Sequence, residues 1–480
     1  MQIAIIGAGM SGILCAIRLR EEGYDDIVIY EKGDSVGGTW RENRYRGLSC
    51  DIPSHVYSYS FAPNPDWSFK YSPGLEIHEY FKRVANDYDV TSHVRFNCEI
   101  TRAQFDGKSW HLWSETEELP SVHVVLAATG ILHHPRMPDI DGIEQFQGPA
   151  FHTARWPDAL DFRGQRVGII GTGSTAIQIV SDIVGEVSSL RLFQRTAQWI
   201  WPEANTPYSD DDKARFRDDP GILPHMRKRM SQQIDAHFSD ALVDADGPAM
   251  RQLEAECLRN LDEHIRDPAL KRKLTPDYRA GCKRLIMSDT FYPAIQQSHA
   301  DVVTEGVARI EAAGVRADDG VLHELDVLVL ATGFNAHQFM RPMHVEGPDG
   351  TTLEQLWSDY VYAYRSIALP QLPNFFMLMG PQSPVGNFSL IDVAEIQFDY
   401  IAQLLAPIRD GRCKAVAPAV AATREFTDDV AAAMHNTIWV TGCSSWYLDE
   451  RGVPITWPWT VHDFDESMRT VEWADYQLLA

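Results

Sequence analysis

Residues 146–157 read FQGPAFHTARWP, and this stretch divides the chain into its two kinds of domain. Its Gly-Pro pair interrupts any regular helix or strand pattern, yet Phe146, His152 and Trp156 give it an unusual density of large side chains for a loop. Patterns typical of nucleotide-binding domains stand on both sides. We therefore interpret the stretch as a linker, although a plain hinge with a packed tryptophan would also fit it.

On the N-terminal side, residues 2–6 are apolar and lead into GAGMSG at positions 7–12, followed by a helical spacing of apolar residues. In such a strand, turn and helix, Gly7 permits the tight turn and Gly9 lets the backbone approach a pyrophosphate. Gly12 lets the helix pack closely on the strand, and the helix N-terminus faces the phosphates. The pattern predicts a first dinucleotide site.

On the C-terminal side the same order recurs. Residues 166–170 form an apolar run, GTGSTA follows at positions 171–176, and residues 177–184 have helical periodicity. This G-x-G-x-x-A form of the fingerprint allows a slightly wider approach of helix and strand. It predicts a second dinucleotide site.

The charge at the end of the next strand differs between the two sites. Glu31 follows Gly12 by nineteen positions, and Arg195 follows Ala176 by the same offset. A carboxylate accepts hydrogen bonds from ribose hydroxyls and repels a 2′-phosphate, so the first site favours FAD or NAD. A guanidinium binds a 2′-phosphate bidentately, with Thr196 as a hydroxyl donor, so the second favours NADPH. A surface arginine paired with an acid is the simpler alternative.

Two further apolar strands, at 122–127 and 326–330, each run into Ala-Thr-Gly. They bracket the middle of the chain, which indicates that one domain is inserted into the other. We predict an α/β fold with two Rossmann-like dinucleotide-binding domains, an FAD domain of residues 1–146 and 336–480 and an NADPH domain of residues 147–335.

Residues 207–275 change in character, because they are rich in charges of both signs and have helical periodicity. Apolar residues recur four apart along one predicted helix face. They are Met226, Met230, Ile234, Phe238 and Leu242. We predict a helical subdomain that forms a lid on the NADPH domain.

Composition narrows the possible partners. The chain has 480 residues, enough for several domains, and its net charge of −24 argues against nucleic acid and anionic membranes. No apolar run approaches the length of a bilayer span, and the first strand leaves no room for a signal peptide. Seven scattered cysteines without C-x-x-C spacing predict free thiols and a cytoplasmic location. They are Cys15, Cys50, Cys98, Cys257, Cys282, Cys413 and Cys443.

The spacing F-x-G-x-x-x-H-x-x-x-W-P in residues 146–157, GGTW at 37–40 and GCKR at 281–284 resembles the pattern of the Baeyer–Villiger monooxygenases. The resemblance covers nearly the whole chain and is weakest in the predicted lid. It implies an enzyme that uses FAD, NADPH and O2 to convert a ketone into an ester or lactone through a flavin C4a-peroxide. It implies no metal.

The resemblance also implies roles for individual residues. Arg284 would be the catalytic arginine, held by Asp51 beside the flavin ring, and Lys283 would contact the 2′-phosphate. The alternatives are that Asp51 caps a turn and that the two cations only solvate a loop. Preorganised positive charge beside a developing anion typically lowers a barrier by ~3–4 kcal/mol. Trp457 lies in a segment that resembles the loop covering the nicotinamide.

Together, the two fingerprints and the resemblance predict a set of cofactor-binding residues. These are Gly7, Gly9, Ser11, Gly12, Glu31, Lys32, Gly38, Thr39, Trp40, Tyr45, Asp51, Gly171, Gly173, Ser174, Thr175, Ala176, Arg195, Thr196, Lys283 and Trp457. The chain departs from the family pattern at Arg46, where proline is usual, and at Trp459, where glycine is usual.

Other functions remain open at this stage. A flavin-dependent S- or N-oxygenase shares both fingerprints, and a nucleotide-binding redox sensor would need no turnover. Disulfide reductase chemistry is disfavoured because no C-x-x-C stands beside a flavin segment. The expected partners are a small ketone and O2, with no nucleic acid and no membrane, and the expected state is a monomer or homodimer.

Overall fold

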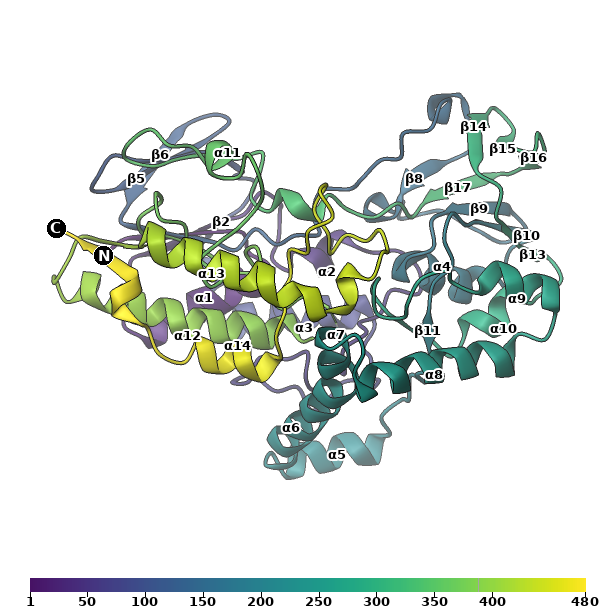
Figure 1. Cartoon of the computed structure of the whole chain (residues 1–480), viewed down its shortest axis with the longest axis horizontal. Coiled ribbons are helices and arrows are strands. Elements are labelled where there is room, and N and C mark those ends of the chain that lie inside the picture. Colours follow the sequence, from purple (N-terminus) through teal and green to yellow (C-terminus); the bar gives the residue numbers. More distant parts are fainter. Residues whose placement is uncertain (387) are drawn as a thin grey trace.

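The computed structural model describes residues 1–386 and 388–480, which form two α/β lobes side by side with helices below their junction (Figure 1). The first lobe contains a five-stranded parallel sheet in the order β19-β7-β1-β2-β3. The strands are β1 (Ile3–Ile6), β2 (Ile27–Tyr30), β3 (Val94–Arg95), β7 (Val124–Ala127) and β19 (Phe375–Met377). The central strands β1 and β7 are buried throughout, as expected for a sheet covered on both faces.

Different elements cover the two faces of this sheet. Helices α1 (Met10–Glu21), α3 (Gly74–Asp87) and α12 (Leu390–Arg409) share one apolar core with it. A four-stranded sheet, β18-β4-β5-β6, lies on the other side. Its strands are β4 (Ile100–Phe105), β5 (Trp110–Ser114), β6 (Glu118–Val122) and β18 (His344–Glu346).

The second lobe repeats the plan with a parallel sheet in the order β13-β10-β9-β17-β8. Its strands are β8 (Ala150–His152), β9 (Arg166–Ile170), β10 (Ser189–Phe193), β13 (Ala300–Val303) and β17 (Val327–Leu330). Helix α4 (Ser174–Ile183) follows β9, and α10 (Phe291–Ile295) packs beside it. Two such lobes confirm the predicted α/β class with two Rossmann-like units.

The linker prediction was wrong for part of residues 146–157. Residues 150–152 are strand β8, which pairs with β17 so that His152 lies opposite Leu330 at the edge of the second sheet. Hydrogen bonding of an edge strand needs no regular side-chain alternation, and a three-residue strand after Gly-Pro has no periodicity to read. The stretch therefore begins the second lobe instead of only leading to it.

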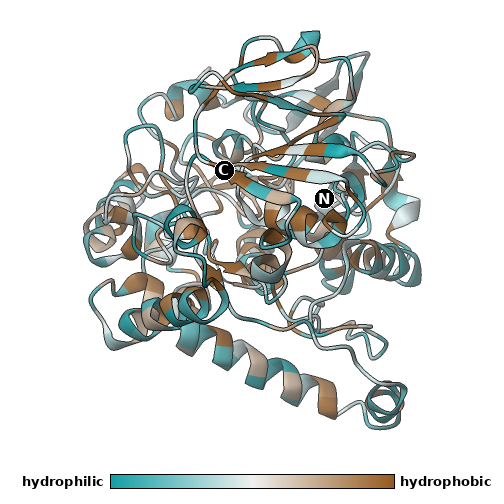
Figure 2. Ribbon diagram, turned by 90° about the vertical axis from the view of Figure 1, so that its right-hand side faces the viewer, coloured by the Kyte–Doolittle hydropathy of each residue, from teal (hydrophilic) through white to brown (hydrophobic). Residues whose placement is uncertain are grey.

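Smaller elements complete the molecule. The remaining strands form a three-stranded antiparallel sheet and two short pairs. They are β14 (Val307–Glu311), β15 (Gly314–Ala317), β16 (Leu322–Glu324), β11 (Ile200–Trp201), β12 (Ile286–Met287), β20 (Ala415–Pro418) and β21 (Tyr476–Leu479). Hydrophobic residues concentrate in the strands in the interior of the molecule, and the outer helices carry hydrophilic residues (Figure 2). The remaining helices of the first lobe are α2 (Thr39–Glu42), α11 (Leu353–Leu356), α13 (Val420–Ala433) and α14 (Val461–Ser467). Within the described ranges, no helix combines the length and the apolar character needed to cross a bilayer.

Residues 207–275 are mostly helical. The helices are α5 (Asp210–Asp218), α6 (Ile222–Ile234), α7 (Asp240–Val243), α8 (Pro248–His264) and α9 (Pro268–Leu274). A π-helical turn at Asp235–Ser239 joins α6 to α7 and rotates the faces of the two helices relative to each other. The four-residue spacing of apolar residues predicts one continuous helix face, and the π-helical turn interrupts that face.

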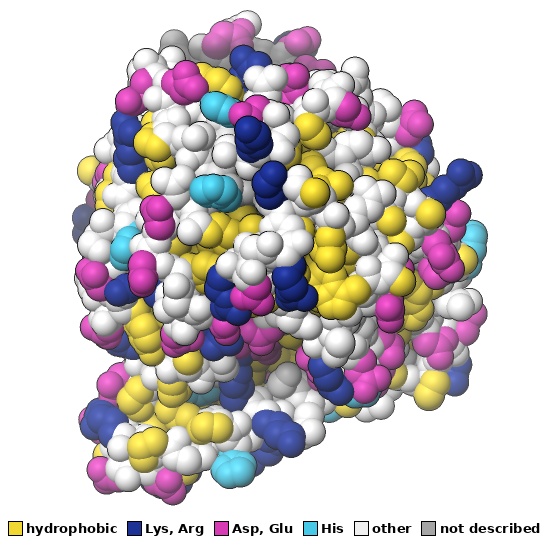
Figure 3. Space-filling model, turned by 90° about the vertical axis from the view of Figure 1, so that its left-hand side faces the viewer, with side chains coloured by type: hydrophobic (Ala, Val, Ile, Leu, Met, Phe, Trp, Pro, Cys, Tyr) yellow, Lys and Arg dark blue, Asp and Glu magenta, His cyan; other side chains and the backbone are white. Residues whose placement is uncertain are grey.

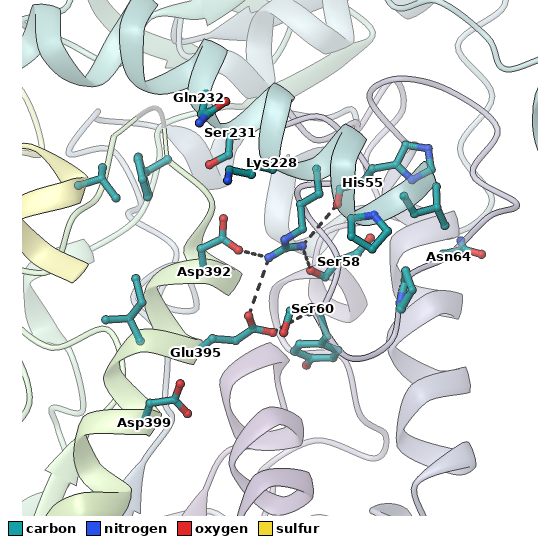
Figure 4. A pocket seen from close by; sticks show the side chains of 18 residues that line it. His55, Ser58, Ser60, Asn64, Lys228, Ser231, Gln232, Asp392, Glu395 and Asp399 are labelled. Atoms are coloured by element: carbon teal, nitrogen blue, oxygen red, sulfur yellow. Dashed lines mark hydrogen bonds and ion pairs between the residues drawn. The ribbon is translucent and has the colours of Figure 1, made fainter. Parts of the chain in front are cut away.

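Arg227 of α6 fastens this helical layer to the first lobe. Its guanidinium donates hydrogen bonds to the carbonyls of Val56 (2.9 Å) and Ser58, and it forms an ion pair with Asp392 of α12. The contact lies in a cavity of about 530 Å³, where Asp392 and Glu395 face the wall that carries Lys228 (Figure 4). Both partners of the pair are about one-fifth exposed, so the charges are partly desolvated.

We expect Arg227→Ala to lower the free energy of unfolding by about 3 kcal/mol, because it leaves a partly buried carboxylate and several carbonyls without a donor. Arg217→Ala is the matched control, because Arg217 of α5 pairs with Asp66 on the exposed surface, where the cost is below ~1 kcal/mol. Denaturant unfolding and amide exchange of α6 measure both effects. Equal losses in the two variants would contradict the fastening role.

Candidate functional site

A cavity of about 620 Å³ lies at the seam of the two lobes. The first lobe contributes its glycine turn, residues 37–43, 45 and 48–52, and the Ala-Thr-Gly stretch 128–130. The second contributes Gly173, Ser174, Thr175 and Arg284. The volume is in the range of ligand-binding cavities, and both predicted nucleotide turns open into the same space.

The first turn leaves room for a ligand only because it lacks side chains. Gly7 has φ +103°, and a Cβ there would come within 2.6 Å of the Ala128 carbonyl oxygen. Gly9 and Gly38 face each other so closely that a Cβ on Gly38 would lie 2.9 Å from the Gly9 Cα. Backbone N–H groups at the start of α1 therefore stand open to an anion.

Glu31 is held by the protein itself. Its carboxylate accepts the N–H groups of Ala8 and Gly33, each at 2.7 Å, and pairs with Arg41 at 2.9 Å. The side chain is buried yet lines the cavity. The predicted ribose acceptor thus also fixes the turn. Reasoning from the sequence missed Arg41, because nothing in its spacing distinguishes it from a surface arginine.

The second turn has the same construction. Gly171 has φ +114°, and any Cβ there would overlap the Ala331 carbonyl, whereas a Cβ on Gly173 would meet nothing within 4 Å. Burial and the neighbouring charge of Arg195 both lower the pKa of Lys283. The Lys283 ammonium lies 4.7 Å from the ring of Tyr278. Arg195 and Lys283 are two cations at one place, with the hydroxyl-bearing Tyr278 beside Lys283, and such a group suits a dianionic phosphate.

Arg284 and Asp51 meet at the seam. The arginine Nε donates to one carboxylate oxygen at 3.0 Å, and Nη2 lies 2.8 Å and 2.7 Å from the two oxygens. Nη1 donates to the Gly386 carbonyl. Burial opposes the charge, but Asp51 and Tyr447 stabilise it and raise the pKa of Arg284. The guanidinium is therefore permanently charged inside the cavity.

Most of the predicted first-site residues line this cavity, but several predicted residues do not. Gly12, Gly171 and Ala176 lie behind the turns, where they allow close packing. Arg195, Thr196 and Lys283 lie outside the cavity wall. Those that line it are Gly7, Gly9, Ser11, Glu31, Lys32, Gly38, Thr39, Trp40, Tyr45, Asp51, Gly173, Ser174, Thr175 and Arg284.

The prediction for Trp457 needs correction. Its indole is buried in the core of the first lobe, where it packs edge-on against Trp459 with 4.7 Å between ring centroids and donates to the Thr460 carbonyl. Trp446 lines the cavity instead. Both tryptophans lie in irregular segments, so spacing alone could not tell which one faces inward. Trp459 packs on Trp457 and does not line the cavity.

Arg46 also lies outside the cavity. It bridges the lobes by pairing with Asp182 of α4 at 2.7 Å and with Glu186 at 2.8 Å. Nearby, the Tyr45 hydroxyl donates to the Gln178 side chain at 2.9 Å. The departure from the family's proline therefore adds a polar contact between the lobes and leaves the cavity wall unchanged.

His152 joins the two chain crossings between the lobes. Its Nε2–H donates to the Gly333 carbonyl at 3.0 Å, and Nδ1 accepts the Ala154 N–H at 3.1 Å. The ring also packs edge-on against Phe334. These contacts fix one neutral tautomer, and burial lowers the pKa of His152. His152 therefore has a structural role at the crossings.

The prediction of seven free thiols was wrong for two of them. Cys282 and Cys443 form a disulfide across 161 positions, while Cys15, Cys50, Cys98, Cys257 and Cys413 are free and buried. Scattered spacing cannot reveal a pairing that depends on two distant loops meeting. Cys282 lies two residues before Arg284, so the bond is next to the site.

The fold and this site define a two-nucleotide oxidoreductase, and comparisons with known proteins agree. Residues 4–239 match the family model described as pyridine nucleotide-disulphide oxidoreductase. A Baeyer–Villiger monooxygenase of Streptomyces coelicolor is 39% identical, covering 100% of this chain and 93% of the relative. An uncharacterized monooxygenase of Mycobacterium bovis is 44% identical over 95% of this chain and 92% of the relative.

Solved structures give the same result. Cyclohexanone monooxygenase from Rhodococcus sp. bound to NADP+ superimposes with a TM-score of 0.89 at 28% identity, covering 100% of this chain and 99% of the other. A complex of OTEMO with FAD and NADP reaches 0.90 at 26% identity with the same coverage. The chain belongs to the Baeyer–Villiger monooxygenase family.

We expect His152 to make the protein less stable in mild acid. Its pKa is lowered in the folded state, so the unfolded chain binds more protons, and stability is lost as pH falls below the ordinary value near 6.5. The difference in unfolding free energy between pH 7.5 and pH 5 should therefore shrink in His152→Gln. Exposed His435→Gln is the control. A variant that keeps the full wild-type difference would refute the assignment.

Proposed function

We propose that this chain is an FAD- and NADPH-dependent monooxygenase that inserts one oxygen atom of O2 beside a ketone carbonyl to give an ester or lactone. The main support for this proposal is the position of Arg284. Its charged guanidinium is held by Asp51 where the two nucleotide turns open into one cavity. FAD, when bound and reduced by NADPH, supplies the activation of O2. The relatives named Baeyer–Villiger monooxygenase support the same reaction class.

The residues present fit both cofactors. In the first turn, the missing side chains of Gly7, Gly9 and Gly38 leave space for a pyrophosphate beside the start of α1. Around the second turn, Arg195 and Lys283 would bind the 2′-phosphate of NADPH. An open glycine turn in the first lobe and two cations at the second turn support FAD in a domain of residues 1–146 and 336–480. They support NADPH in a domain of residues 147–335.

Arg284 would act on the substrate. Oxygen insertion builds negative charge on the ketone oxygen, and a preorganised cation in a water-poor site stabilises that charge without reorganisation. Asp51 occupies Nε and Nη2, and the Gly386 carbonyl accepts from Nη1. Arginine carries five N–H donors, so at least one on Nη1 is left for the substrate. Asp51 is thus a positioning residue.

Trp446 would form the substrate side of the cavity, with Tyr57 and Val385 as apolar neighbours in the same wall. A ketone carbonyl needs one directed donor, and the rest of such a molecule needs apolar contact. The cavity wall provides Arg284 as the donor and Trp446, Tyr57 and Val385 for apolar contact. Thioethers and amines need no cation beside a carbonyl, which is why we place S- or N-oxygenation second.

The surface supports a small-molecule enzyme in the cytoplasm. The net charge is −24, and positive and negative side chains are interspersed over the face shown in Figure 3. Nucleic acids and anionic lipids would require a continuous basic patch. We propose no nucleic-acid or membrane partner, and a monomer or homodimer.

For Arg284→Ala we expect NADPH to reduce the flavin at close to the wild-type rate, while ester formation falls by ~10²–10³-fold, because the cation acts only after reduction. Stopped-flow absorbance gives the first rate and product mass spectrometry the second. Arg284→Lys should recover part of the loss at most, since a point charge cannot keep the bidentate contact with Asp51. Unchanged ester formation in Arg284→Ala would remove the proposed role.

The substrate class can be tested in parallel. Wild-type protein is offered a cyclic ketone, an aryl ketone and a thioether at equal concentration, and the products are identified by mass. Ester or lactone from either ketone supports the proposal. Oxygenation of the thioether alone would establish the alternative function.

Cofactor preference should depend on Arg195 and Lys283. In Arg195→Ala the KM for NADPH should rise by about tenfold while the KM for NADH changes little, since a charged hydrogen bond to phosphate contributes ~1.5–3 kcal/mol. Arg163→Ala, which changes an exposed arginine of the same lobe paired with Asp161, is the control. Equal loss with both nucleotides would argue against recognition of the 2′-phosphate.

A further inference from the structure

The disulfide between Cys282 and Cys443 connects the two loops that enclose Arg284. Cys282 lies in the loop between α9 and β12, two residues before the arginine. Cys443 lies in the segment 438–449, which continues to Trp446 on the cavity wall and Tyr447 beside the guanidinium. The disulfide therefore joins the loop that carries Arg284 to the segment 438–449, which covers the guanidinium.

Noncovalent contacts alone connect these loops weakly. The Cys282 sulfur lies 4.0 Å from the Trp439 carbonyl, and Trp439, Tyr447 and Cys443 share an apolar cluster with Cys282. The Trp439 indole N–H is buried without a hydrogen-bond partner among the described residues. Apolar contact is non-directional, so without the covalent bond it would not fix the register of one loop on the other.

The segment is anchored to the first lobe at only a few points. His337 hydrogen-bonds to the Trp446 carbonyl at 2.6 Å, and Ile455 donates to the Tyr447 carbonyl at 2.9 Å. Between residues 441 and 444 three of four residues are exposed, and Gly442 has φ +103°. This part of the segment has no regular secondary structure, and the disulfide ties it directly to the Cys282 loop.

We propose that the Cys282–Cys443 bond is a redox-sensitive positioning device that keeps Tyr447 and the covering segment on Arg284, so that the oxidised protein couples NADPH consumption to ketone oxygenation better than the reduced protein. The two cysteines are positioning residues, since neither contacts the space where a substrate would lie. This inference rests on the proposed function.

The redox step is a simple exchange. Two thiols and one peroxide molecule give the disulfide and two molecules of water, with two electrons passing from sulfur to peroxide oxygen. A small dithiol reverses the bond through a mixed disulfide and becomes the oxidised ring. Both cysteines are buried, but Cys443 keeps 8% of its surface exposed and Cys282 none, so Cys443 is the sulfur that a small dithiol reaches first. Disulfides of reducing compartments are often transient or redox-sensing, which suits such a role.

The device should affect one half of the reaction. Flavin reduction by NADPH uses the glycine turns of both lobes, and of the proposed NADPH-binding residues only Lys283 adjoins the disulfide. At saturating NADPH, the rate of flavin reduction should therefore change less than about twofold. Ester formed per NADPH should fall about tenfold on reduction of the bond, because sub-ångström misplacement of a catalytic group costs up to ~10²-fold. The missing equivalents should be recovered as hydrogen peroxide.

The test uses the full-length holoenzyme with FAD, a ketone that the wild type converts, and NADPH. Wild-type protein is compared after treatment with hydrogen peroxide and after treatment with dithiothreitol, each removed before assay. Peptide mapping without reductant must recover residues 282 and 443 as one linked species in the first sample. Two free thiols in that sample would overturn the proposal.

Variants separate positioning from stability. Cys443→Ser should behave like the reduced wild type under both treatments, with flavin reduction retained. Cys413→Ser is the matched control, a free buried cysteine outside the site, and it should respond to dithiothreitol as the wild type does. Equal coupling in the oxidised and reduced wild type would refute the device. Absence of any ketone product in the oxidised wild type would instead refute the function on which it rests.

Discussion

The structure depends on one ion pair between its lobes. Arg284 and Asp51 are 233 positions apart, and each is mostly withdrawn from water. A desolvated charge without its partner would cost several kcal/mol, so the pair is stable only while the two lobes keep the glycine turns facing one cavity. The requirement explains why so much polar structure surrounds the seam. Every contact that sets the angle between the lobes also sets the position of the cation.

Those contacts are of two kinds. Near the crossings the contacts are polar. His152 donates a hydrogen bond to Gly333, Tyr45 donates one to Gln178, and Arg46 forms an ion pair at the end of α4. Polar interfaces of this kind allow domains to rotate at low cost. The disulfide is covalent and joins the C-terminal segment to the loop that carries Arg284, while Arg227 fastens the helical layer to the first lobe.

Local patterns predicted the parts of the fold that depend on local chemistry. The glycines of each turn recur at fixed spacing between one strand and the helix that follows it, so the fingerprints placed the cradles, and the offset of Glu31 and Arg195 indicated their polarity. Arg284 followed from its motif. The disulfide and Arg227 escaped prediction because their partners lie far away in sequence. Arg41 escaped it because its spacing does not distinguish it from a surface arginine. Trp446 was missed in favour of Trp457 because an irregular loop has no period that marks its inner face.

The two departures from the family pattern, Arg46 and Trp459, both lie outside the cavity. Arg46 and Trp459 both replace residues that favour turns, yet neither side chain enters the cavity. Arg46 adds charge pairs to α4, and Trp459 adds an indole to the core around Trp457. Both changes therefore act on the rigidity of the frame around Arg284. The side chains of Trp446 and Val385, in contrast, share the cavity wall with the cation, so we expect changes there to alter substrate preference.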